Sequence, residues 1–368
     1  MKSPGYWPQW IVVLTSIAIL VISVASGKTS PAFFRELYPA RVDQTLSAPG
    51  VSALHDILDS ARNADLRWSD FTPYKTEVAK LYESNGFSLL WVQDGRIRAQ
   101  GLAVIELLQN ANAKGLDPED YDGSRWQVRL LKLKQKPSDE DLVSFDTALT
   151  VSVMRYIRAI HSGRVNPKEF KFQLDMEGKQ LPLAEFIQAQ VVNAGDPAAE
   201  IQKLEPPFLG YRKLLALLPV YEGYAKQDDG QKLPMIKNAV RPGQAYAGLA
   251  RLGWFLRVIG DIPAGVQLNP NASIYQGALV NGVKNYQDRH GLTPTGNLDA
   301  RTINELNTPP AARIRQIRLT LERWRWLPAW APRHPRARMP PWRWPVLWSA
   351  AAPASPPRWL SRSPAPTW

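Results

Sequence analysis

The sequence predicts a mainly α-helical protein, with a larger helical domain, a small three-helix bundle behind it and a disordered C-terminal tail. Three observations predict this class. Apolar residues recur at spacings of three and four between Ser47 and Trp326, which places them on one face of successive helices. Glycines and proline pairs separate these segments. After Pro328 the periodicity stops, and no part of the tail has the pattern of a helix or a strand.

Residues 45–225 form the larger predicted domain. Three segments in it, residues 54–61, 102–111 and 140–160, carry apolar side chains at helical spacing. Residues 87–92 are apolar, short and preceded by an Asn-Gly break, so we expect them to be extended.

The second predicted domain spans residues 241–308 and contains three short helices. Glycines stop the first two, and Asp299 is a suitable N-cap for the third. A polar linker, residues 226–234, separates the two domains. The apolar faces of the first two helices consist of Tyr246, Leu249, Leu252, Leu256, Ile259, Tyr275, Leu279, Val283 and Tyr286.

An amphipathic helix is predicted within residues 311–328. Its apolar stripe includes Ile317 and Leu321, and we expect this stripe to dock against a domain that follows. Without such a partner, the helix is expected to expose Trp324 and Trp326 and to favour aggregation or proteolysis.

The first residues of the chain have the pattern of an export segment. Lys2 precedes an apolar run at residues 11–25, with small residues at its end, as in a signal peptide. We therefore interpret residues 1–28 as a signal peptide or a membrane anchor, and we expect a periplasmic protein. The pattern leaves open whether the segment is cleaved or holds the protein in the inner membrane.

The tail, residues 329–368, is a low-complexity sequence. It holds ten Pro, six Trp and six Arg but no Asp, Glu, Lys or Gly. Its arginines supply half of the net charge of +12, and the remaining charge is spread along the chain, so nucleic acid is not an expected partner. The chain has no cysteine and only four scattered histidines, so we expect neither a metal nor another cofactor.

The second domain carries a specific motif in addition to its helical pattern. The motif combines an aromatic-Gln pair, a His-Gly-Leu turn, a Thr-Gly turn and a Leu-Asp helix start. It resembles the peptidoglycan-binding three-helix module. The residues that carry the likeness are Val280, Val283, Tyr286, Gln287, His290, Gly291, Leu292, Pro294, Thr295, Gly296, Asp299, Thr302, Leu306 and Asn307.

The wider chain, over roughly residues 45–328, resembles the large L,D-transpeptidases of Gram-negative bacteria. These proteins combine an export anchor, a helical scaffold domain, a peptidoglycan-binding module and a catalytic domain. The supporting stretches are Tyr82–Val92, Gly115–Tyr121, Gly163–Pro167, Glu205–Tyr211 and Leu321–Pro328.

The resemblance implies a function that this chain only partly matches. Family members form peptide cross-links in peptidoglycan through a cysteine in a Ser-His-Gly-Cys motif, placed well beyond the counterpart of Pro328. This chain has neither the motif nor any cysteine. We therefore expect the peptidoglycan-binding and scaffold portion of an L,D-transpeptidase-like cell-wall protein, non-catalytic as it stands, with no catalytic residue assigned.

Two alternatives remain open. The tail has the composition of GC-rich DNA translated out of frame, so a frameshift, biological or in sequencing, is one hypothesis. If it arose in sequencing, the protein is an active L,D-transpeptidase. The second alternative is a cell-wall hydrolase that uses an acidic pair, either Glu119 with Asp120 or Glu140 with Asp141. Adjacent acids near a helix start more often act as caps or solvated groups.

The expected ligand is the glycan or the peptide of peptidoglycan. A glycan offers hydroxyls and flat apolar faces, so its site needs amide or carboxylate partners and aromatic surface. The candidate residues are Gln287, His290, Tyr286 and Asp299. Tyr286 lies on the apolar stripe and Asp299 on the cap position, so structural roles are favoured for both. Gln287 and His290 are the better candidates for exposed contacts.

Overall fold

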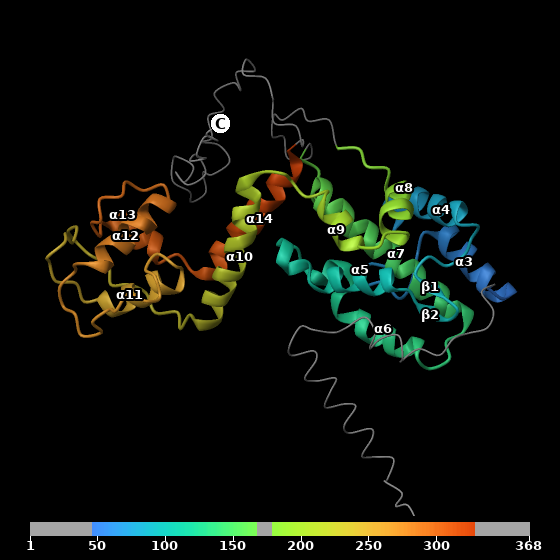
Figure 1. The fold of residues 1–368 in the computed structure, drawn as a ribbon, viewed down its shortest axis with the longest axis horizontal. Helices are drawn as coiled ribbons and strands as arrows, with labels where there is room; N and C mark the ends of the chain where they lie inside the picture. The colour runs from blue at the N-terminus through green and yellow to red at the C-terminus, as the bar shows by residue number, and fades with distance from the viewer. Residues whose placement is uncertain (1–45, 168–178, 328–368) are drawn as a thin grey trace, which may run out of the picture. The chain divides into compact units, whose positions relative to one another are not determined.

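The computed structural model describes residues 46–167 and 179–327 (Figure 1). It is mainly helical, which confirms the predicted class. The expected signal or anchor segment and the low-complexity tail lie outside the described residues. Within the described part of the chain, no helix is long and apolar enough to cross a membrane.

Contacts divide the chain into two compact units. The first contains the described residues up to Asn110, with Asp117–Ile157 and Gln180–Leu204. The second contains Ala111–Leu116, Arg158–Lys179 and the described residues from Glu205 onward. Helix α7 (Asp139–Ser162) runs from one unit into the other. The domain boundaries expected from the sequence remain a prediction.

The first unit, which we call the scaffold unit, is an assembly of helices around α7. Its core contains fully buried aromatic residues such as Trp91 and Trp126. Short 3-10 helices at Thr72–Tyr74, Pro118–Tyr121 and Gly123–Arg125 and a π-helical turn at Gln188–Val192 connect its elements. The longer elements are α3 (Ala48–Ser60), α4 (Lys75–Ser84), α5 (Ala99–Gln109), α6 (Trp126–Leu133), α8 (Leu183–Ile187) and α9 (Pro197–Gln202).

The apolar stretch after Asn85-Gly86 is held by one buried carboxylate. Asp146, on α7, accepts hydrogen bonds from the backbone N–H groups of residues 90, 91 and 92 at 3.0, 2.7 and 3.2 Å. The Tyr82 hydroxyl donates to the same carboxylate at 2.6 Å. The end of this stretch forms β1 (Val92–Gln93), which pairs antiparallel with β2 (Arg96–Ile97). Of the predicted extended segment, residues 87–92, only Val92 lies in a strand.

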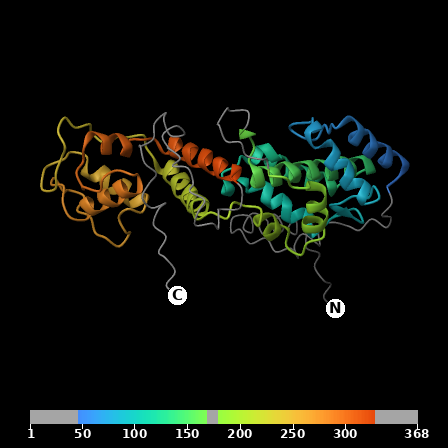
Figure 2. The same ribbon diagram turned by 90° about the horizontal axis from the view of Figure 1, so that it is seen from above.

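The second unit, which we call the binding unit, contains the predicted three-helix bundle. The bundle consists of α11 (Leu249–Val258), α12 (Ala278–Arg289) and α13 (Ala300–Leu306). Two longer helices, α10 (Leu209–Gln227) and α14 (Pro310–Trp326), pack along each other (Figures 1 and 2). One hydrophobic cluster joins residues of all five helices. The unit also contains a 3-10 helix at Ala111–Lys114.

Helix α14 has partners within its own unit. Its Trp324 ring lies 5.1 Å from the ring of Phe208, and both Trp324 and Trp326 are half-buried. Arg325 is fully buried and donates to the Lys114 carbonyl and the Tyr211 hydroxyl. The expectation that α14 exposes its tryptophans is therefore wrong, because segments distant in the sequence cover them.

Candidate peptidoglycan-binding site

The four residues predicted to bind peptidoglycan lie close together at the end of α12 and the start of α13. Gln287 joins the two helices, because its amide nitrogen donates to Thr302 Oγ1 at 3.1 Å. Asp299 caps α13 by accepting a hydrogen bond from the Thr302 backbone N–H at 2.7 Å. The motif residues therefore lie together in one part of the fold, where α12 meets the start of α13.

Gln287 is buried, with 1% of its surface exposed. Its Oε1 accepts from the Gly296 N–H at 2.8 Å, and its Nε2 donates to the Asn297 carbonyl at 2.8 Å. These bonds fix the Thr-Gly turn against α12. A Cβ on Gly296, which has a φ of +75°, would come within 2.9 Å of Val280 and Lys284. The expectation that Gln287 is an exposed contact is wrong, because its amide is satisfied inside the fold.

Tyr286 is buried and His290 is half-buried beside it. Their rings stack with centroids 4.0 Å apart, and Tyr286 is 1% exposed, which confirms its expected place in the core. His290 Nδ1 lies 3.3 Å from Glu305, which pairs with Arg313 at 2.8 Å. Burial lowers the pKa of His290 to about 4, so its imidazole is neutral at pH 7. Of the four candidates, Gln287 and Tyr286 have almost no surface to offer a ligand.

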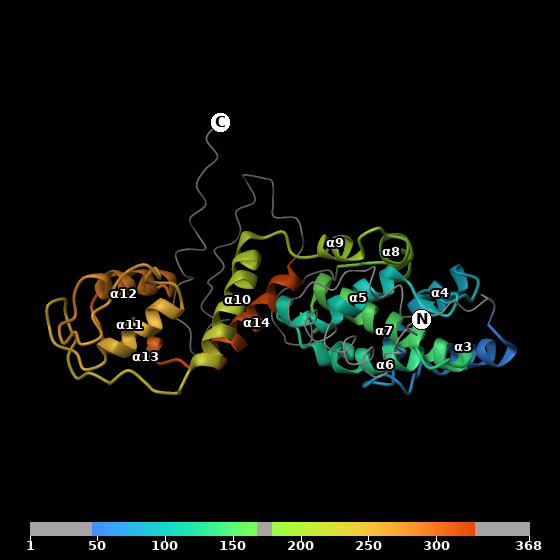
Figure 3. The ribbon, with the colours of Figure 1, turned by 60° about the horizontal axis from the view of Figure 1, so that its bottom comes forward.

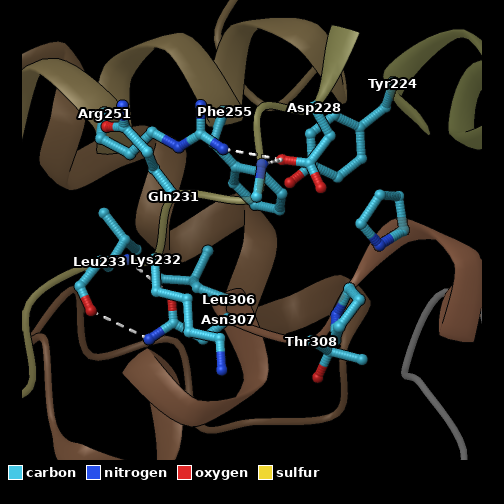
Figure 4. A pocket seen from close by; sticks show the side chains of 13 residues that line it. Tyr224, Asp228, Gln231, Lys232, Leu233, Arg251, Phe255, Leu306, Asn307 and Thr308 are labelled. Atoms are coloured by element: carbon cyan, nitrogen blue, oxygen red, sulfur yellow. Dashed lines mark hydrogen bonds and ion pairs between the residues drawn. The ribbon is translucent and has the colours of Figure 1, made fainter. Parts of the chain in front are cut away.

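A hollow on the binding unit lies near the end of α13. The residues that line it are Tyr224, Asp228, Gly230, Gln231, Lys232, Leu233, Arg251, Phe255, Leu306, Asn307, Thr308, Pro309 and Pro310 (Figure 4). They come from the end of α10, the following loop, α11, α13 and the start of α14. Gln231 and Lys232 are exposed, whereas Tyr224 and Phe255 are buried.

Two sets of contacts hold the loop that borders this hollow. Arg251 pairs with Asp228 at 2.8 Å and Asp229 at 2.9 Å. On the other side, the Asn307 side chain accepts from the Leu233 N–H at 2.7 Å and donates to the Leu233 carbonyl at 3.0 Å. The dashed lines of Figure 4 show the pair of Arg251 with Asp228 and the contact between Asn307 and Leu233. The loop is thus fixed at both ends by side chains of the bundle.

The hollow combines the groups that a sugar or a short peptide needs. Lys232 provides an ammonium donor, Gln231 an amide and Thr308 a hydroxyl, and proline and aromatic rings form apolar walls. The sequence does not reveal this hollow, because residues 226–234 have the composition of a linker. Spacing along the chain could not show that Asp228 and Asp229 both pair with Arg251.

One member of each acidic pair considered for hydrolysis accepts hydrogen bonds within the fold. Glu119 accepts from the backbone N–H and hydroxyl of Ser124 at 3.0 and 2.9 Å, and it pairs with Arg67 at 3.4 Å. Asp141 accepts from the backbone N–H of Ser138 at 3.0 Å. These contacts favour the structural interpretation of both pairs.

Two family models match the chain. A scaffold domain model matches residues 76–218, and a peptidoglycan binding domain model matches residues 247–306. Comparison with curated proteins finds no match. The chain thus carries a scaffold domain followed by a peptidoglycan-binding domain, which supports peptidoglycan as its partner and a cell-wall-associated binding role.

Proposed function

We propose that the chain is the peptidoglycan-binding and scaffold portion of an L,D-transpeptidase-like protein of the periplasm, and that it binds the wall without catalysing a reaction. The observation that carries this proposal is the succession of a scaffold domain and a peptidoglycan-binding domain in a sequence without cysteine. Cross-linking by L,D-transpeptidases needs a cysteine thiolate as nucleophile, and this sequence contains no cysteine.

We further propose that the hollow beside α13 is the contact surface for peptidoglycan. Its exposed polar groups surround apolar walls, whereas the motif residues Gln287 and Tyr286 are enclosed. In this proposal the motif residues stabilise the three-helix bundle, and the neighbouring loop, residues 228–233, binds the ligand.

Co-sedimentation of the full chain with purified sacculi tests the function. The full chain is expected to pellet with sacculi and, when supplied with donor and acceptor stem peptides, to produce no new cross-links. Failure to pellet would reject the binding function. Cross-linked products would reject the non-catalytic assignment while leaving binding intact.

Substitutions in the hollow test the site separately. The variant Gln231→Ala, Lys232→Ala and Thr308→Ala removes three polar groups and is expected to weaken sacculus binding by about tenfold. Lys237→Ala with Gln267→Ala is the matched control, because both residues are exposed on the binding unit and neither lines the hollow. Equal binding by the triple variant and the parent would exclude the hollow as the contact surface.

A further inference from the structure

Helix α6 carries apolar side chains on two opposite faces. Trp126, Leu130 and Leu133 are buried within the scaffold unit. On the other face, Val128 and Leu131 are 57% and 47% exposed. A surface helix normally carries polar residues opposite its buried stripe, so the exposed aliphatic pair on α6 departs from the usual pattern. The helix lies at the edge of the unit away from α8 (Figures 1 and 3).

The exposed side of α6 is surrounded by positive charge. Arg125, Lys132 and Lys136 are exposed, and the sequence contains no Asp or Glu from Gly123 to Ser138. The remaining arginine of the helix, Arg129, is buried and pairs with Asp122 at 3.1 Å, so it adds nothing to the outer surface.

Three acids near the ends of this stretch, Asp122, Glu119 and Asp139, have partners of their own, whereas Glu140 is exposed. Glu119 pairs with Arg67 and accepts from Ser124. Asp139 is buried and accepts from the Ser47 N–H at 2.6 Å. The exposed face of α6 is therefore both apolar and cationic.

We propose that this face of α6 docks on the surface of an anionic phospholipid bilayer. Val128 and Leu131 enter the boundary between head groups and acyl chains, and the surrounding cations meet the lipid phosphates. Two aliphatic side chains are too few for a stable protein interface, which buries on the order of 800 Å² per partner. A bilayer needs no such shape complementarity. This role is distinct from wall binding, which involves the other unit.

The chain contains no cysteine, so a single introduced cysteine can be labelled selectively. We would place an environment-sensitive fluorophore on α6 through Gln127→Cys, and on α4 in a second protein through Glu83→Cys; both positions are exposed. Each labelled full-length protein is mixed with vesicles that contain a nitroxide-labelled lipid. One vesicle set contains phosphatidylglycerol with phosphatidylcholine, and the other contains phosphatidylcholine alone.

The α6 label is expected to be quenched about threefold more than the α4 label on the anionic vesicles, and this excess should vanish on neutral vesicles and at high salt. Comparison of two labels removes any effect of the apolar run at residues 11–25, since both proteins carry it. Equal quenching at the two positions, or an excess that persists on neutral vesicles, would overturn the proposal.

Charge reversal provides a second test with a matched control. Lys132→Glu with Lys136→Glu is expected to abolish the excess quenching of the α6 label. Lys226→Glu with Lys237→Glu makes the same change of net charge at exposed positions of the binding unit and is expected to leave it unchanged. Circular dichroism would verify that each variant is folded. Excess quenching that survives the α6 reversal, or that is lost equally in both variants, would contradict the proposal.

Discussion

The side chain of Gln287 satisfies three groups that would otherwise be unpaired inside the binding unit. It accepts from Gly296 and donates to Asn297 and Thr302. A buried donor or acceptor that loses its partner costs more than the bond contributes when formed. The conformation of the turn at residues 293–297 therefore depends on this one amide.

Gln287→Ala is expected to lower the unfolding free energy of the binding unit by roughly 3 kcal/mol, because it leaves buried polar groups unpaired and opens a cavity. Thermal and denaturant unfolding of the full chain would measure this loss. Asn281→Ala, at an exposed position of the same helix, is the control and should change stability little. A variant as stable as the parent would show that the turn does not depend on Gln287.

Residue roles were predictable from sequence only where they depend on neighbours along the chain. The cap at Asp299 and the core position of Tyr286 follow from local pattern, and the structure confirms both. Glutamine is usually a surface residue. The partners of Gln287, Gly296 and Asn297, come close to it only because the turn folds back on α12. When a polar residue borders an apolar stripe, the sequence alone does not show whether its side chain is buried or exposed.

At the scale of elements, one carboxylate connects α14 to a loop far away in the sequence. Glu322 Oε1 accepts from the backbone N–H groups of Arg164 and Val165 at 2.6 and 3.1 Å, and from Trp326 Nε1 at 3.2 Å. A Cβ on Gly163 would come within 2.5 Å of the same oxygen. The Gly-Arg-Val turn is therefore fitted closely against this helix.

Glu322→Ala is expected to release this turn and to increase the rate of tryptic cleavage after Arg164 by about tenfold, because local opening governs proteolysis. Limited digestion followed by mass spectrometry would locate the cut. Gln316→Ala, exposed on the same helix, should leave the rate unchanged. An unaltered rate in the Glu322 variant would mean that other contacts hold the turn.

Element positions were more predictable than element contacts. Apolar spacing placed α11, α12, α13 and α14, because each buries one face. Spacing could not reveal that α14 has partners in α10 and in the turn at Gly163. The hydrogen bond that Val165 donates to Glu322, for example, joins residues 157 positions apart in the chain. Long-range pairings of this kind leave no periodic trace in a sequence.

At the scale of the whole molecule, two buried groups respond to acid in opposite directions. In the scaffold unit, burial raises the pKa of Asp146 to about 6, although its four donors favour the charged form. In the binding unit, burial lowers the pKa of His290 to about 4. Either shift corresponds to roughly 3 kcal/mol of unfolding free energy.

The two groups change the unfolding free energy with pH in opposite directions. The folded scaffold unit holds a proton on Asp146 that the unfolded chain releases, so this contribution is complete below pH 3.8 and is lost as the pH rises through about 6. As the pH falls, His290 takes up a proton in the unfolded chain before it does so in the folded one. Its contribution to the unfolding free energy is therefore present above pH 6.5 and is lost as the pH falls toward about 4.

Acidification from pH 6.5 to pH 4 is therefore expected to weaken the binding unit relative to the scaffold unit and to separate their thermal transitions. Calorimetry of the full chain across this interval would record the separation. Asp146→Asn should remove the pH dependence of one transition, and His290→Asn that of the other. Transitions that move together in the parent and in both variants would contradict the assignment.

The two bonds between Asn307 and Leu233 have a further consequence for recognition. A free loop must give up conformational entropy when it closes on a ligand, and this loss reduces affinity. Here the loss has already occurred during folding, because the amide of Asn307 holds the loop in place before any ligand arrives. If the hollow is the contact surface, as we propose, the binding unit presents that surface already ordered, and its affinity for the wall depends in part on the amide of Asn307.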